Sequence, residues 1–193
     1  MKALVVYESM YGNTRHVAEA IAEGLRASMP TEAVLARDAT VVDLDDIDLV
    51  VAGAPTHAFG LSGPRTREAA VLDGIKHPDH LLDADPQNDG VREWLQVLPR
   101  PAACFGVAFD TRLDKPKLLT GSASRAIQRG LRHSGFSTLA EPHSFTVTAM
   151  AGPLAPGEIE RAEQWGEALG RMVIRSTRTT TTTTRRTPVL VGG

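Results

Sequence analysis

The stretch KALVVYESMYGNTRHVAEAIAEGLRA, residues 2–27, decides the fold class. It begins with an apolar, β-rich run over residues 2–7 and continues through a polar segment, residues 8–14, that contains one glycine. Over residues 15–27 apolar side chains recur every three or four positions, which is the spacing of a helix with one buried face. The stretch therefore predicts a strand, a loop and a helix.

Apolar strand-like runs and helical patterns alternate along the rest of the chain. Further strands are predicted over residues 33–37, 49–54, 101–109 and 144–148, and further helices over residues 61–72, 91–95, 122–133 and 159–173. Residues 74–90, rich in Asp, Pro and His, are expected to form a surface excursion. Strands that alternate with helices favour an α/β fold, with a doubly wound parallel sheet of about five strands and helices on both faces.

The composition is that of an ordinary globular protein. The chain has 193 residues, of which 42% are hydrophobic and 23% charged, enough for one domain. No apolar run approaches the roughly 20 residues that cross a bilayer, and the start of the chain soon becomes polar, so we expect a cytoplasmic protein without membrane contact. The single cysteine, Cys104, excludes an internal disulfide and a multi-cysteine metal site, and no metal site is expected.

Charge is distributed unevenly between the body and the end of the chain. The net charge is -2, but residues 175–193 contain four arginines and no acid, so residues 1–174 carry -6. An acidic body argues against nucleic-acid binding, which needs clustered Lys and Arg. Residues 179–184 are six consecutive threonines, which offer no apolar face. We therefore expect one domain over residues 1–174 and a disordered Thr/Arg-rich tail over residues 175–193.

The loops that follow the strands are where the chemistry is expected. In an open parallel sheet, ligands bind beyond the carboxyl ends of the strands. The first such loop, residues 9–14, brings two hydroxyls, an amide and a glycine directly before a helix, so its N–H groups and the positive helix end can face a phosphate without a lysine. The same residue types also suit a simple helix cap, so both interpretations stay open.

Three of these loops carry a resemblance to a known family. Ser9-Met10-Tyr11-Gly12-Asn13-Thr14 resembles the phosphate loop of the flavodoxins, and it follows the first strand as in that family. Residues 53–60 resemble the second flavin loop, after the third strand, and residues 108–112 resemble the loop after the fourth. The resemblance covers about residues 1–174 and implies the strand order 2-1-3-4-5, with FMN bound where the winding reverses.

The resemblance also implies contacts for FMN. The phosphate would be held by the side chains of Ser9, Tyr11, Asn13 and Thr14 and the amides of Met10 and Gly12. The flat flavin ring would be lined on one side by Pro55, Thr56, His57, Ala58, Phe59 and Gly60, and at its other edge by Phe109, Asp110, Thr111 and Arg112. No catalytic residue is implied, and the expected partner is a redox protein or a small-molecule electron acceptor.

Three functions remain open within this fold. The first is an FMN-binding electron-transfer protein, the second an NAD(P)H-dependent FMN oxidoreductase acting on a quinone or other small acceptor, and the third a binding module without cofactor. Other classes lack their motifs, because the third strand ends in Ala52-Gly53-Ala54-Pro55 without a phosphate-accepting aspartate and the first loop has no cysteine nucleophile. The nucleotide-hydrolase, hydrolase-elbow and dinucleotide patterns are absent as well.

Overall fold

The computed structural model describes residues 1–39, 43–56, 60–77, 89–115 and 121–184, with the backbone alone for 179–184. Strands and helices alternate along most of the chain, as predicted. In chain order the elements are β1 (Ala3–Tyr7), α1 (Asn13–Arg26), β2 (Thr31–Leu35), β3 (Leu49–Pro55), α2 (Pro64–Lys76), α3 (Val91–Val97), β4 (Phe105–Leu113), α5 (Ala123–His133), β5 (Ser137–Thr138), β6 (His143–Val147) and α6 (Glu158–Thr184).

The strands form one sheet with the order β2-β1-β3-β4-β5, which confirms the predicted winding. All of these pairings are parallel. The sheet has six strands instead of the predicted five, because two short strands lie beside β4 in succession. β5 pairs with the start of β4, at residues 105–106, and β6 pairs with its end, at residues 109–113.

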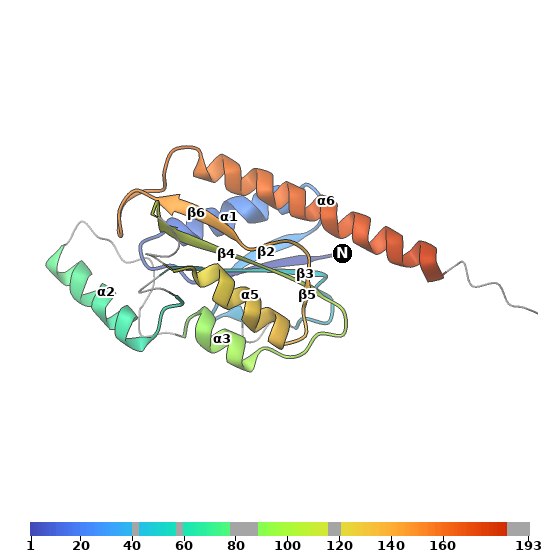
Figure 1. Cartoon of the computed structure of the whole chain (residues 1–193), viewed down its shortest axis with the longest axis horizontal. Coiled ribbons are helices and arrows are strands. Elements are labelled where there is room, and N and C mark those ends of the chain that lie inside the picture. Colours follow the sequence, from blue (N-terminus) through green and yellow to red (C-terminus); the bar gives the residue numbers. More distant parts are fainter. Residues whose placement is uncertain (40–42, 57–59, 78–88, 116–120, 185–193) are drawn as a thin grey trace, which may run out of the picture.

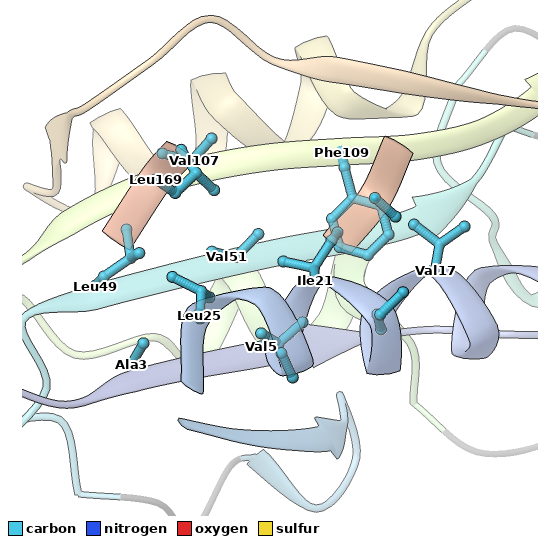
Figure 2. Close-up of a cluster of buried hydrophobic side chains, with 14 of the residues drawn as sticks. Ala3, Val5, Val17, Ile21, Leu25, Leu49, Val51, Val107, Phe109 and Leu169 are labelled. Atoms are coloured by element: carbon cyan, nitrogen blue, oxygen red, sulfur yellow. The ribbon is translucent and has the colours of Figure 1, made fainter. Parts of the chain in front are cut away.

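Each face of the sheet buries its own apolar core. Side chains alternate between faces along a strand, so Val5 and Val51 point to one side and Leu4 and Val50 to the other. The first core lies under α1 and α6, and Figure 2 shows Ile21 and Leu25 of α1 over β1 and β3, with Leu169 of α6 near Val107 of β4. The second core includes residues of α3 and α5. Helices thus cover both faces, as the doubly wound arrangement requires.

α2 differs from the other helices in its position. Figure 1 shows it beyond the edge of the sheet at which the parallel strands end, on the side of the loops that follow them. Only Arg67 and Ala70 of this helix are buried. The helix continues to Lys76, so residues 74–76 of the predicted excursion are helical, and residues 78–88 lie outside the described residues.

α6 is longer than the sequence pattern predicts. The apolar spacing ends at Val173, which is fully buried, but the helix continues to Thr184. Threonine has only a modest helix penalty, so an established helix can extend through such residues. Figure 1 shows this end of α6 projecting past the sheet. The predicted disordered tail therefore begins with a helical segment, and its residues 185–193 lie outside the described part of the chain.

No helix among the described residues has the length and hydropathy to cross a membrane.

Candidate functional site at the carboxyl edge of the sheet

The loop between β1 and α1 presents unpaired polar groups. Ser9 is 4% exposed, and its Oγ has no hydrogen-bond partner among the described residues. Gly12 directly precedes α1 and has a φ of 83°, in the left-handed region that favours glycine. Among the described residues no side chain caps this helix, and its first turn contains no acid, so no described group neutralises its positive end. A buried hydroxyl without a partner costs about 1–3 kcal/mol, which an anionic ligand at this position would recover.

The two polar side chains that follow connect the loop to other parts of the site. Asn13 Nδ2 donates to the carbonyl of Gly152, at 2.7 Å, in the segment between β6 and α6. Thr14 Oγ1 lies 2.8 Å from Thr111 Oγ1 on β4. If the Thr111 hydroxyl donates, the Thr14 hydroxyl keeps its own proton for a ligand. The loop is thus fixed against both β4 and the segment that precedes α6.

The Tyr11 side chain contacts α2. Its hydroxyl donates to Asp73 Oδ2 of α2, at 3.1 Å. Burial, together with this hydrogen bond and the Asp73 charge, raises the pKa of the Tyr11 phenol to about 12. The phenol therefore joins the first loop to α2 as a neutral donor, and its predicted contact with a phosphate stays a prediction.

The ends of β3 and β4 meet the start of α5 around Asp110. This aspartate is fully buried, and its Oδ2 accepts from Thr56 Oγ1 at 3.1 Å, from Ser122 Oγ at 2.9 Å and from the Ser124 N–H at 2.9 Å. Thr56 Oγ1 accepts in turn from the Ala123 N–H, at 3.0 Å. Asp110 Oδ1 is buried without a partner in the described structure. The cluster therefore caps α5 and leaves one buried carboxylate oxygen of Asp110 without a partner among the described residues.

The predicted loop over residues 108–112 is wrong, because these residues belong to β4. The expectation rested on the polar residues Asp110, Thr111 and Arg112, but all three are buried and each hydrogen-bonds to a neighbouring segment. A strand can contain buried polar residues when nearly all of their polar groups are hydrogen-bonded. Residues 101–104, predicted as the start of this strand, precede it.

Phe109 lies in the core instead of at an edge of the site. Its ring is fully buried and packs against Phe145, with ring centroids 6.1 Å apart and planes at 79°. A side chain at Gly53 would overlap this ring, so the phenyl group occupies the space above β3. Arg112 is also buried, and its guanidinium donates to the carbonyl of Lys115 in the segment after β4.

The second predicted flavin loop is described only at its ends. Pro55 closes β3, and the Thr56 N–H donates to the carbonyl of Thr111 at 2.8 Å. Gly60 is half-buried, with open space where a Cβ would stand. His57, Ala58 and Phe59 lie outside the described residues. Their predicted contacts with a flavin ring therefore stay predictions.

A buried polar network behind the first loop was missed by the sequence analysis. The carboxylate of Glu8 is 7% exposed, and it accepts from the Ser62 hydroxyl and from the Val91 N–H at the start of α3, at 3.0 Å. Arg67 of α2 donates to Ser62 Oγ at 3.3 Å and forms a bidentate pair with Glu93 of α3, with both distances 3.1 Å. One signal was present in the sequence, namely a carboxylate directly after an apolar strand.

The Arg67–Glu93 pair keeps a carboxylate ionised in a partly buried position. Burial alone would raise the pKa of Glu93, but hydrogen bonds from Arg67 and from the Gly90 N–H outweigh it and hold that pKa below its ordinary value. A Cβ at Gly90 would overlap the Glu8 carboxylate. The network therefore fixes α2 and α3 against the end of β1.

Comparison with known proteins agrees with this arrangement. A family model described as a flavodoxin domain matches residues 4–64, which include β1, the loop, α1, β2 and β3. This match covers less than half of the chain, and together with the strand order β2-β1-β3-β4-β5 it supports a resemblance to the flavodoxins. The fold of the chain is flavodoxin-like.

Solved structures share this flavodoxin-like fold at low sequence identity. A flavodoxin from the domain Archaea is 17% identical, with a TM-score of 0.59 over 90% of this chain and 99% of that one. Oxidised flavodoxin 1 from Bacillus cereus is 18% identical, with a TM-score of 0.57 over 91% and 98% of the two chains. A WrbA-like flavodoxin from Agrobacterium tumefaciens is 16% identical, with a TM-score of 0.54 over 90% and 98%.

One curated relative matches part of the sequence more closely. It is an NAD(P)H dehydrogenase (quinone) from Geobacter sulfurreducens, 42% identical over 90 residues. The matched stretch spans 47% of this chain and 42% of the relative's length.

Proposed function

We propose that this protein binds FMN non-covalently at the carboxyl edge of its sheet and transfers electrons. The observation that carries the proposal is Ser9 Oγ, a buried hydroxyl without a partner, beside the uncapped start of α1. A dianionic phosphate suits such a place, because helix N–H groups and hydroxyls donate to its oxygens. Ser9, Asn13, Thr14 and the amides of Met10 and Gly12 would hold it.

The other end of the cofactor would lie between the ends of β3 and β4. Thr56 and Gly60 belong to the segment after β3, and the half-satisfied carboxylate of Asp110 lies at the end of β4. When bound, the flavin would supply the electron-transfer chemistry, while the chain sets its position and its access to solvent. His57, Ala58 and Phe59 would form the wall of the ring, as the family resemblance implies.

An FMN titration of the full chain, followed by visible absorption, tests the proposal. We expect one FMN per chain, and clearly weaker binding of riboflavin, which lacks the phosphate. Ser9→Ala should weaken FMN by about tenfold, the value of one hydrogen bond to a charged group, without altering riboflavin binding. Ser28→Ala removes a hydroxyl beyond the other end of α1 and serves as the control with unchanged affinity. A protein that ignores added FMN would support the cofactor-free binding module instead.

The partial match to a quinone dehydrogenase favours a second candidate, an NAD(P)H-dependent FMN oxidoreductase acting on a quinone or another small acceptor. Mixing the FMN-loaded protein with NADPH and a soluble benzoquinone distinguishes the two. An electron-transfer protein leaves NADPH unoxidised until a reductase is added, whereas an oxidoreductase consumes it unaided. The partner is accordingly a redox protein in the first case and a small acceptor in the second. A cytoplasmic location stays a prediction.

A further inference from the structure

The outer face of α5 carries a stripe of basic side chains. Arg125, Arg129 and Arg132 are exposed and lie four and three residues apart, so they follow one side of the helix, with the exposed His133 at its end. α5 contains no acidic residue. With a rise of 1.5 Å per residue, the three guanidinium groups extend over about 10 Å of the surface. We call these three arginines the α5 stripe.

The acids of the described strands and helices that pack against α5 do not neutralise the stripe. α5 packs against β3, β4, β5 and α3, and the acids of these elements are Asp110 and Glu93. Asp110 is buried against the first turn of α5, and Glu93 is paired with Arg67 of α2. Within the described structure, none of the three stripe arginines forms an ion pair, and Arg132 Nε donates to the neutral Thr138 hydroxyl at 2.9 Å.

The stripe differs in charge from the rest of the body. Residues 1–174 carry a net charge of -6, so a cluster of three arginines without an acid is a local reversal. The other face of the sheet is mixed in charge, because α1 and α6 each contain as many glutamates as arginines. A hollow there of about 980 Å³ is lined by several acidic residues, Glu19, Glu23, Glu158, Glu160 and Glu163.

The stripe also begins at the candidate site. The first turn of α5 contacts Thr56 and Asp110 at the carboxyl edge of the sheet, and Figure 1 shows α5 running back from that edge along the lower face. A macromolecule that lies along α5 therefore reaches the rim of the site.

We propose that the α5 stripe is the docking surface for an acidic protein that exchanges electrons with this one. Its redox role rests on the proposed function, whereas the docking itself rests on the charge pattern. An acidic surface complements three guanidinium groups that form no ion pair among the described residues, because guanidinium groups bind carboxylates in bidentate fashion. A nucleic acid suits the surface less well, because the stripe spans about 10 Å and the acidic body repels an extended phosphate chain.

Binding of a plant-type [2Fe–2S] ferredoxin, chosen as a small acidic redox protein, tests the docking. Biolayer interferometry on the FMN-loaded full chain should show binding at about 20 mM salt that is lost near 500 mM. Arg125→Glu combined with Arg129→Glu should weaken it at least tenfold at low salt. The control is Arg171→Glu combined with Arg175→Glu, which makes the same charge change at the same spacing on α6. Its affinity for ferredoxin should stay within twofold of the wild-type value.

The other outcomes overturn the proposal. They are an absence of salt-dependent ferredoxin binding, an equal loss in the α6 control, or tighter binding of a 20-base-pair DNA duplex that the α5 variant abolishes. The visible spectrum of the same sample reports FMN separately. A colourless protein that still docks ferredoxin through α5 would remove the redox role and leave the docking surface in place.

Discussion

At the scale of single residues, Phe109 owes its position to Gly53. The ring fills the space that a side chain on β3 would need, and it is fully buried, so it has no room to turn away. Gly53→Ala should therefore destabilise the fold by about 1–3 kcal/mol, the range for overpacked cores. The free energy of unfolding in urea measures this. Gly60→Ala is the matched control, since its Cβ would meet no described atom within 4 Å, and it should change the free energy of unfolding by less than about 0.5 kcal/mol.

Single residues also show where the sequence was informative about the site. Ser9 and Thr14 lie in the loop that the sequence singled out, and the Ser9 hydroxyl has no hydrogen-bond partner among the described residues. Asp110 was placed in a loop, because a buried charge inside a strand is costly unless it is hydrogen-bonded. Its partners Ser122 and Ser124 are more than ten residues further along the chain, and only the folded structure shows that they meet.

At the scale of elements, the backbones of α1 and α6 approach each other closely at two glycines. A Cβ at Gly166 of α6 would overlap the carbonyl of Ile21 in α1, and one at Gly24 would overlap the carbonyl of Glu163. Alanine normally stabilises a helix interior by about 1 kcal/mol over glycine. We expect Gly166→Ala to destabilise the protein instead. It should lower the free energy of unfolding by at least about 2 kcal/mol, because the two helices must move apart to make room for the Cβ.

A second helical glycine provides the comparison for this prediction. At Gly130 of α5 the nearest atom to a Cβ is the end of the flexible, half-buried Leu95 side chain, at 2.9 Å. Gly130→Ala should therefore stay within about 1 kcal/mol of the wild type in the same urea experiment. Equal losses in both variants would contradict the close approach of α1 and α6.

The contact between α2 and α3 should give the stability a pH dependence. The folded-state pKa of Glu93 lies below its ordinary value of 4.5, so the stabilisation is present above pH 4.5 and is lost as the pH falls through the lower folded value. Glu93→Gln should cost about 1 kcal/mol at pH 7, and the difference from wild type should shrink below pH 4.5. Urea unfolding at pH 7 and pH 3.5 measures it.

The exposed pair of Arg15 and Glu19, 3.6 Å apart on α1, supplies the control for this pH effect. Glu19→Gln should change the free energy of unfolding by less than about 0.5 kcal/mol at pH 7, because water screens the pair. A loss in Glu93→Gln that persists unchanged at pH 3.5 would contradict the ionic role of Glu93.

The order of the elements was predictable because it depends on local periodicity. Apolar β-rich runs gave β1 and β3, and three-to-four spacing gave α1 and α5. The two-residue strand β5 carries no periodic signal, and it forms only because β4 lies beside it. The end of α6 was missed for a similar reason, since six threonines offer no apolar face even where the helix continues through them.

At the scale of the whole molecule, the buried face of α6 ends at Val173. This is the last fully buried apolar side chain of α6, while Arg175 and Arg178 are exposed. For a variant truncated after Arg178, the free energy of unfolding in urea should stay within about 0.5 kcal/mol of the wild-type value. Such a result would support a domain that ends near residue 174, whereas a large loss of stability would show that the remainder belongs to the folded body.

The central claim concerns the place at which the flavin phosphate binds, and ¹⁵N–¹H correlation spectra of the full chain during an FMN titration test it most directly. The account predicts saturation at one FMN per chain, with the largest shifts at the backbone amides of residues 9–15 and smaller ones near Thr56. Riboflavin should leave the amides of residues 9–15 much less affected. An absence of shifts, or shifts confined to the opposite edge of the sheet near β5, would contradict it.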